Sequence, residues 1–385
     1  MRTIYTSCLM TIAALAVATS CGKSDTPTAA SGPVDVRLVV SSGNNTRVGS
    51  DATDNDIRQL RVYAFNAKGE KVGYAKADNL QGQNYIPITL SEGGDINFYV
   101  IANGNFGPKP TVGTTSVTDW TSLSKTDLES LKFDLSGFTG WSTTGDFVSP
   151  MSNNRYDEFG NELKNDSGTA YKNDYGKAVN VLEPKNETLI IPVTVQHVLG
   201  RLRLMLNKDA AAGDVTIKVT SAVLYHRPDA FKLYFSYGEK DKIDDVITFT
   251  NNAEPLTEQL IDASNAVTLD VKPDDGYTTI ARTYLAPNQY GSSDPDTYNA
   301  QKTDGTTSNG LNKAYRLELT VEFAYNTTGT SEIKETKYYT VYLPRVPRNT
   351  SIDVQGTFKG TVINPEFNVM TEAWEEKVMN IPEFQ

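Results

Sequence analysis

The feature that most constrains this chain is a strict alternation of apolar and polar residues in many short segments. In residues 315–325, every second residue is a large apolar or aromatic one: Tyr315, Leu317, Leu319, Val321, Phe323 and Tyr325. Successive side chains of a β-strand point to opposite faces, so this pattern predicts a strand with one buried face. Further strand-like runs, either alternating or mostly apolar, occupy residues 34–40, 60–65, 96–102, 188–195, 198–206, 337–343, 351–355 and 367–369. Many short strands separated by turn residues predict β-sandwiches.

Length indicates more than one domain. The chain has 385 residues, and at roughly 150 residues per domain this suggests about two. We place the boundary near residue 190. One helix is expected in the first domain, capped by Ser124 and Asp127, with Leu128, Leu131 and Phe133 on one face. The polar segment 150–180 is expected to be a long loop.

Charge and cysteine content exclude several classes of function. The chain has 36 Lys and Arg against 47 Asp and Glu, so 36 − 47 gives a net charge of −11. Nucleic-acid binding usually requires a basic face, so we expect no nucleic-acid partner. The two cysteines, Cys8 and Cys21, both lie near the start, and His197 and His226 are the two histidines. These residues predict no disulfide framework in the body of the chain, no metal site and no cofactor.

The sequence offers no recognisable catalytic motif. It contains no GxSxG, P-loop, GxGxxG or HExxH pattern. The acidic groups around Asp51 and Asp274 do not have calcium-loop spacing, and no carboxylate pair is singled out for glycoside hydrolysis. Trp120 and Trp141 could stack on sugars, but packing in a sandwich is the more economical interpretation. We therefore expect a protein that is not an enzyme.

The N-terminus has the layout of a bacterial lipoprotein signal. A short start containing Arg2 precedes the apolar run 9–17 and the small residues Ala18-Thr19-Ser20, which end at Cys21. This run is too short for a membrane-spanning helix, so residues 1–20 are predicted to be a signal peptide. Acylation of the thiol and of the freed amine of Cys21 would provide the several chains that a stable outer-membrane anchor needs. Residues 22–33 are small and polar, which favours a flexible tether.

The order of these features resembles the Bacteroidetes fimbrillin family, the lipoprotein-derived subunits of the type V pilus. The resemblance rests on Cys21 with its tether, on strand 34–40 followed by the loop around Arg47, and on strands 60–65 and 96–102. It continues with the basic and apolar strand 197–203, and with residues 348–354 followed by Val369 and Trp374. It covers nearly the whole chain.

The resemblance implies assembly rather than catalysis. It implies an all-β fold of two transthyretin-like or Ig-like Greek-key β-sandwich domains in tandem, with a short helix in the first. Residues 21–47 would be a lipidated propeptide, residues 48–190 the N-terminal domain, and residues 191–385 the C-terminal domain with a donor tail. The precursor would be anchored in the outer membrane and then enter a fimbrium on the cell surface, where it serves adhesion.

The resemblance also implies the steps of maturation. An Arg-specific protease would cut between Arg47 and Val48 and remove the first strand, whose inward residues are Val34, Val36, Leu38 and Val40. A strand from within Phe367–Gln385 of another fimbrial subunit, in a homopolymer or a mixed fimbria, would fill the groove. The candidate donor residues are Val378, Met379, Ile381 and Phe384. Pro382 interrupts their alternation and would weaken pairing there.

Other interpretations remain open at this point. An anchor subunit of the same fimbria would keep its lipid, and a tip subunit would need no donor tail while binding a host or bacterial surface ligand. A glycan-binding surface lipoprotein would need an exposed aromatic platform and would stay monomeric. A secreted hydrolase is the remaining alternative. The mature N-terminus distinguishes them, because Val48 indicates a polymerising subunit and a lipidated Cys21 indicates an anchor or a glycan binder.

Overall fold

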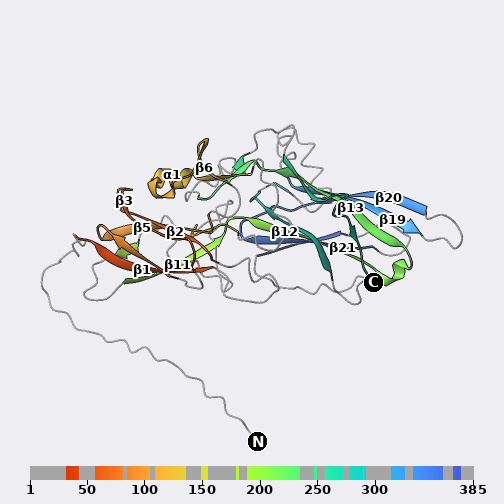
Figure 1. The fold of residues 1–385 in the computed structure, drawn as a ribbon, viewed down its shortest axis with the longest axis horizontal. Coiled ribbons are helices and arrows are strands. Elements are labelled where there is room, and N and C mark those ends of the chain that lie inside the picture. The colour runs from red at the N-terminus through yellow and green to blue at the C-terminus, as the bar shows by residue number, and fades with distance from the viewer. Residues whose placement is uncertain are drawn as a thin grey trace, which may run out of the picture.

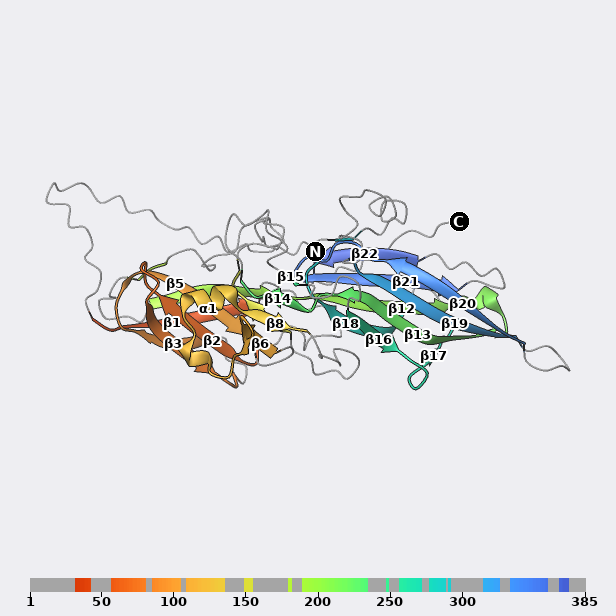
Figure 2. The ribbon, with the colours of Figure 1, turned by 90° about the horizontal axis from the view of Figure 1, so that it is seen from above.

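We describe the fold from a computed structural model of the chain. The structure describes residues 32–42, 57–80, 85–104, 109–135, 149–154, 179–181, 189–234, 247–248, 256–271, 277–288, 290–291, 314–325, 333–358 and 367–373. The described residues are almost entirely β-strands, in two parts arranged along the long axis of the molecule (Figures 1 and 2). This confirms the predicted all-β, sandwich-like fold.

The first part contains one large sheet that curls back on itself. Its strands follow the order β3-β2-β5-β9-β11-β1-β4, and β10 pairs with β5. Strand β3 at one end and β4 at the other approach each other, because the Ser91 amide donates to the Val72 carbonyl at 2.8 Å. The strands are β1 (Val34–Ser42), β2 (Leu60–Phe65), β3 (Lys71–Ala77), β4 (Tyr85–Leu90), β5 (Gly94–Ala102), β9 (Met151–Ser152), β10 (Val179–Val181) and β11 (Leu189–His197).

The second part is a sandwich of two sheets. One sheet has the order β18-β12-β21-β22, and the other has the order β16-β13-β19-β20 with β17 on β13. Alternate residues of the facing strands form a single core, which includes Leu204, Val219, Leu319 and Val354. The strands are β12 (Gly200–Lys208), β13 (Thr216–Arg227), β16 (Leu256–Ile261), β17 (Val267–Thr268), β18 (Thr278–Leu285), β19 (Arg316–Tyr325), β20 (Ile333–Tyr342), β21 (Thr350–Phe358) and β22 (Phe367–Ala373).

A small third sheet joins the two parts. Its order is β15-β14-β8-β6-β7, with β6 (Lys109–Val112), β7 (Thr115–Ser116), β8 (Lys132–Asp134), β14 (Ala230–Lys232) and β15 (Ile247–Thr248). Beside it lie the 3₁₀ turn η1 (Trp120–Ser122) and the helix α1 (Lys125–Ser130), and a second 3₁₀ turn, η2 (Ala210–Ala212), follows β12. Strand β8 comes from the first part of the chain and β14 from the second, so the sheet crosses the junction between them.

The predicted strand segments are present, but the helix, the segment 150–180 and several further strands differ from what the sequence predicted. The helix begins after the Ser124 and Asp127 capping box as expected, but it ends at Ser130. Phe133 therefore lies in β8 and not on the helix. The segment 150–180 contains β9 and the start of β10, where a loop was expected. Strands β3 and β4 were not predicted, nor were β13, β16 and β18 of the second sandwich.

The boundary predicted near residue 190 falls inside β11. Strand pairing assigns β11 to the first sheet, because it runs parallel to β1 from Leu189 to Val195. The change from the first sheet to the second sandwich therefore lies at residues 198–199, between β11 and β12. Among the residues that the structure describes, no helix combines the length and the apolar character needed to cross a bilayer.

Candidate functional site

The candidate site is the position that β1 occupies in the first sheet. Strand β1 lies between β4, with which it is antiparallel, and β11, with which it is parallel. Leu38 is aligned with Ile86 on one side and with Ile191 on the other. Both backbone edges of β1 are therefore used, as they are in an interior strand. We call this position the β1 slot, with β4 and β11 as its walls.

The inward face of β1 is completely buried. Val34, Val36, Leu38 and Val40 are each at most 2% exposed. They join one apolar cluster with Ile86, Ile88 and Leu90 of β4, and with Ile191, Val193 and Val195 of β11. Burying one such side chain contributes about 1.5–3 kcal/mol. The apolar half of the alternation that predicted this strand is therefore the set of side chains that fills the slot.

The outward face of β1 carries polar and aromatic contacts that are open to solvent. The Thr89 hydroxyl donates to the Asp35 carboxylate at 2.6 Å, and the Arg37 guanidinium lies 4.8 Å from the centre of the Tyr85 ring. On the other wall, Ile190 is 59% exposed beside Arg37. Exposed contacts of this kind add little stability. Burial of the inward face and the backbone ladders hold β1 in the slot.

Gly73 on β3 lies against the side chains of the β4 wall. A Cβ added at Gly73 would lie 2.7 Å from Cδ2 of Leu90 and 3.1 Å from Cδ1 of Ile88. Both side chains belong to the β4 wall and share the core with β1. The absence of a side chain at this position lets β3 pack closely against β4.

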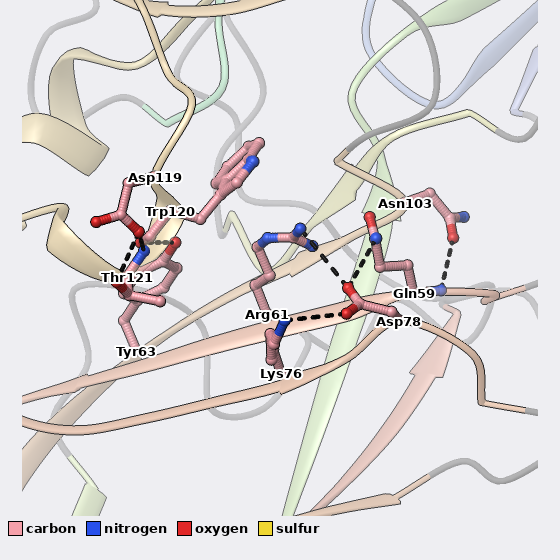
Figure 3. A network of polar contacts seen from close by, with 9 residues as sticks. All are labelled: Gln59, Arg61, Tyr63, Lys76, Asp78, Asn103, Asp119, Trp120 and Thr121. Carbon is pink, nitrogen blue, oxygen red and sulfur yellow. Dashed lines mark hydrogen bonds and ion pairs between the residues drawn. The ribbon is translucent and has the colours of Figure 1, made fainter.

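The chain enters β2 through a fixed set of polar contacts (Figure 3). Asn103 lies at the end of β5 with φ of 57°, and its Oδ1 accepts from the amides of Arg58 at 2.9 Å and Gln59 at 3.3 Å. The Gln59 side chain in turn donates to Asp78 at 3.2 Å. The hydrogen bond from Lys76 holds the pKa of the Asp78 carboxyl below its usual value. Residues 58–61 are thereby anchored independently of β1.

Arg61 is enclosed within this region. Its side chain is 6% exposed, and Asp78 lies 3.8 Å from its Nη2 atom. The guanidinium also lies 4.8 Å from the ring of Trp120, whose carbonyl accepts from the Tyr63 hydroxyl at 2.8 Å. Figure 3 shows Arg61 between the indole and Asp78. Burial raises the pKa of Tyr63 far above its ordinary value. This arginine is therefore part of the packing and is closed to a protease.

Most of the sequence-predicted site residues lie outside the described residues. These are Cys21, Arg47, Val48, Val378, Met379, Ile381 and Phe384. The structure places the inward residues of the first strand together in the slot, and their removal stays a prediction. The wall residues Ile86, Ile88 and Leu90 were missed. Their own alternation could have revealed them, since they are separated by Pro87 and Thr89 in a run of six residues.

Neither metal nor catalytic chemistry is found at the slot. Within the described ranges, no group of three or more His, Cys, Asp or Glu side chains could hold a metal ion. The slot is lined by aliphatic side chains, which can pack against another strand but carry no reactive group. Its geometry fits the binding of an extended peptide segment.

The fold and the slot define a class: a two-part β-sandwich protein whose first strand is inserted between the walls of its own first sheet. Residues 33–189, from just before β1 to the start of β11, match the model of a protein family described as major fimbrial subunit protein (FimA). This match confirms the resemblance to fimbrillins that the sequence indicated. No curated protein matches the chain.

Solved structures share the fold over most of the chain. The fimbrilin FimA of Porphyromonas gingivalis W83 has 14% sequence identity and a TM-score of 0.52, covering 89% of this chain and 97% of that one. A candidate cell adhesion protein of Bacteroides eggerthii gives 14% identity and a TM-score of 0.52, covering 90% and 97%. One from Parabacteroides distasonis gives 12% identity and a TM-score of 0.50, covering 91% and 99%.

Together, the family match and the shared fold support a fimbrial structural subunit. This class of protein is not enzymatic. Its members polymerise with other fimbrial subunits and form fimbriae on the cell surface.

Proposed function

We propose that this protein is exported as a lipoprotein anchored through Cys21, is cleaved between Arg47 and Val48, and polymerises by strand exchange in a fimbria that serves adhesion. The observation that carries the proposal is the β1 slot. One strand at the start of the chain supplies four fully buried side chains between two walls that are themselves built from later segments.

Loss of β1 would leave a strong binding site for another strand. The β4 and β11 edges that face β1 would lose their partners, and unpaired strand edges are templates for strand addition. Four buried side chains at about 1.5–3 kcal/mol each supply roughly 6–12 kcal/mol before ordering costs. A replacement strand with the same alternation would recover this free energy. In this proposal, residues 378–384 of the next subunit provide that strand.

The position of the other arginines supports Arg47 as the cleavage site of an Arg-specific protease. Arg37 lies within β1 and is paired on both sides. The Arg58 amide is held by Asn103, and Arg61 is packed between Trp120 and Asp78. Arg47 belongs to a polar Asn-Asn-Thr-Arg segment of the sequence between β1 and β2, and this composition is typical of the segments that proteases cut.

The mature N-terminus on cells tests this proposal. We expect mass spectrometry of surface fimbriae to find a chain that starts at Val48. The Arg47→Ala variant should yield a longer, folded monomer that retains a lipid-modified Cys21, because β1 still fills the slot. Arg37→Ala is the matched control, and it should be cleaved and assembled normally.

Three results would contradict the proposal. Fibres built from uncleaved Arg47→Ala protein would exclude release of β1 as the step that permits assembly. A mature chain that starts at Cys21 and carries lipid in wild-type fimbriae would instead assign the protein as an anchor subunit. A chain that starts at Val48 but terminates fibres would assign it as a tip subunit.

A further inference from the structure

A strand from the second part of the chain completes a sheet of the first part. Strand β14 follows β13 of the second sandwich, yet it pairs antiparallel with β8, with Phe231 opposite Phe133. Two further backbone bonds extend this ladder at its ends. The Leu233 amide donates to the Leu131 carbonyl at 2.9 Å, and the Leu135 amide donates to the Asp229 carbonyl at 2.6 Å.

The side chains on this ladder form one core with the first sheet. The rings of Phe133 and Phe231 lie 5.4 Å apart, and both residues are completely buried. Just after β14, the Tyr234 hydroxyl donates to the Val100 carbonyl of β5 at 2.8 Å. The Tyr234 ring meets the Tyr99 ring edge to face at 5.2 Å. The segment 230–234 is thus packed into the first part of the molecule.

Arg348 attaches the same segment to the second sandwich. This residue is 3% exposed and lies in the turn that precedes β21. Its Nη1 donates to the Leu233 carbonyl at 2.7 Å, and its Nη2 donates to the Lys232 carbonyl at 2.7 Å. The next residue, Asn349, donates its amide to the Leu199 carbonyl at 3.0 Å. A charged fork with two bonds is both strong and directional.

We propose that the β8–β14 ladder and the Arg348 fork form an interdomain lock, which makes the two parts of the molecule a single rigid unit. Domains joined by one short link usually move relative to each other unless their interface is large and apolar. Here the covalent link at residues 198–199 is reinforced by a backbone ladder, a shared aromatic core and a buried cation. A force applied along the long axis of the molecule is then carried both by the covalent link at residues 198–199 and by the interdomain lock. The inference is independent of strand exchange at the β1 slot.

Hydrogen exchange in the full-length chain tests the lock. We expect peptides covering residues 229–234 to be as strongly protected as peptides from β19 in the wild-type protein. Arg348→Met keeps the length of the side chain but removes the donor to the buried Leu233 carbonyl and the donor to the Lys232 carbonyl. Exchange of residues 229–234 should then be roughly tenfold faster, with β19 unchanged. Arg345→Met, three residues away on an exposed side chain, is the matched control and should change neither peptide.

The outcomes separate a lock from general stabilisation. Loop-like exchange of residues 229–234 in the wild-type protein would overturn the proposal, as would wild-type exchange of these residues in Arg348→Met. A uniform increase in every peptide would also overturn it, because Arg348 would then support global stability alone. If Arg348→Met does not fold, Tyr234→Phe removes a single hydroxyl and should still accelerate exchange locally.

Discussion

Two buried polar residues, Asn103 and His197, lie at the ends of β5 and β11 in the first sheet. Asn103 has a left-handed backbone conformation, and its side-chain oxygen accepts two backbone amides where β2 begins. His197 is 2% exposed and lies opposite Met151. Burial, followed by the charge of nearby Arg201, lowers the pKa of His197 to about 3. The hydrophobic pattern of the sequence does not reveal either role: the amide hydrogen bonds that Asn103 accepts and the lowered pKa of His197 both depend on the groups around them in the fold.

His197 should make the stability of the protein dependent on pH. Its folded-state pKa is depressed below the ordinary value of 6.5, so protonation favours the unfolded chain. The free energy of unfolding should be unaffected above pH about 6.5 and should fall below it, by up to about 1.4 kcal/mol per pH unit. Urea unfolding between pH 7 and pH 5 measures this slope, and His197→Gln should reduce it.

His226 is the natural comparison for this experiment. Burial lowers its pKa as well, but the hydrogen bond to the Ala314 carbonyl opposes the shift. His226→Gln should therefore remove less of the slope than His197→Gln does. An identical slope in the wild type and in His197→Gln would show that His197 is not held neutral by burial.

At the scale of elements, β1 and β12 occupy similar positions with different attachments. Each begins its part of the molecule, and each pairs with one antiparallel strand and one parallel strand. Strand β12 is tied to β21 by a two-bond Arg203–Asp353 pair and by the Asn207–Thr357 hydrogen bond. Strand β1 meets its walls through apolar burial and exposed outer contacts. Of the two, β1 is the strand suited to release.

A substitution at Gly73 should disturb the β4 wall of the slot. The new methyl group of Gly73→Ala would force Leu90 and Ile88 to shift within a packed core. Overpacking of this kind costs about 1–3 kcal/mol, which outweighs the gain of about 0.4–1 kcal/mol from a less flexible unfolded chain. Urea unfolding should report a lower midpoint with an unchanged m-value.

Gly32→Ala is the matched control for this substitution. No atom lies within 4 Å of a Cβ built at Gly32. The free energy of unfolding of the Gly32→Ala protein should therefore stay within about 0.5 kcal/mol of the wild type or rise slightly. Equal effects of the two substitutions would mean that close packing of β3 against β4 does not support the slot.

At the scale of the whole molecule, the β1 slot and strand β22 lie in different parts along the long axis (Figures 1 and 2). Strand β22 is the last strand of its sheet and pairs with β21 along Phe367–Ala373. The proposed donor residues follow it in the sequence. Donation from one part of a subunit to the slot of another does not close on itself, so repetition gives a filament. The interdomain lock would keep the geometry of each repeat constant.

Truncation after Lys377 should abolish polymerisation without unfolding the protein. It removes the proposed donor residues 378–384 and retains all the strands described here. Circular dichroism should be unchanged, whereas protease-treated protein should no longer form an SDS-resistant ladder. In the full-length chain, replacing Met379 and Ile381 with serine should have the same effect. Replacing Glu376 and Lys377 with glutamine is the control. Ladders from the truncated protein would place the donor within Phe367–Trp374.

The sequence by itself determined the helix cap and the strands with the clearest apolar patterns, because both depend on local patterns. Alternation and short apolar runs are properties of neighbouring residues, so β1 and β19, which alternate, and β2 and β5, which are mostly apolar, could be recognised without knowledge of their partners. The Ser124 and Asp127 capping box is similarly local. The inward residues of β1 were identified for the same reason, since they are the apolar half of an alternating strand.

Only the tertiary structure decided which strands lie side by side and what each buried polar group does. The parallel pairing of β1 with β11 joins segments about 150 residues apart, and the pairing of β8 with β14 crosses between the two parts of the chain. Alternation indicates that one face of a strand is buried, but it does not indicate which other strand packs against that face. The pairing of β4 with β1, the change from one sheet to the next at residues 198–199 and the Arg348 fork therefore had no local signal strong enough to reveal them. They depend on packing between segments that are far apart in the sequence, where the fit of the two surfaces determines the free energy of folding.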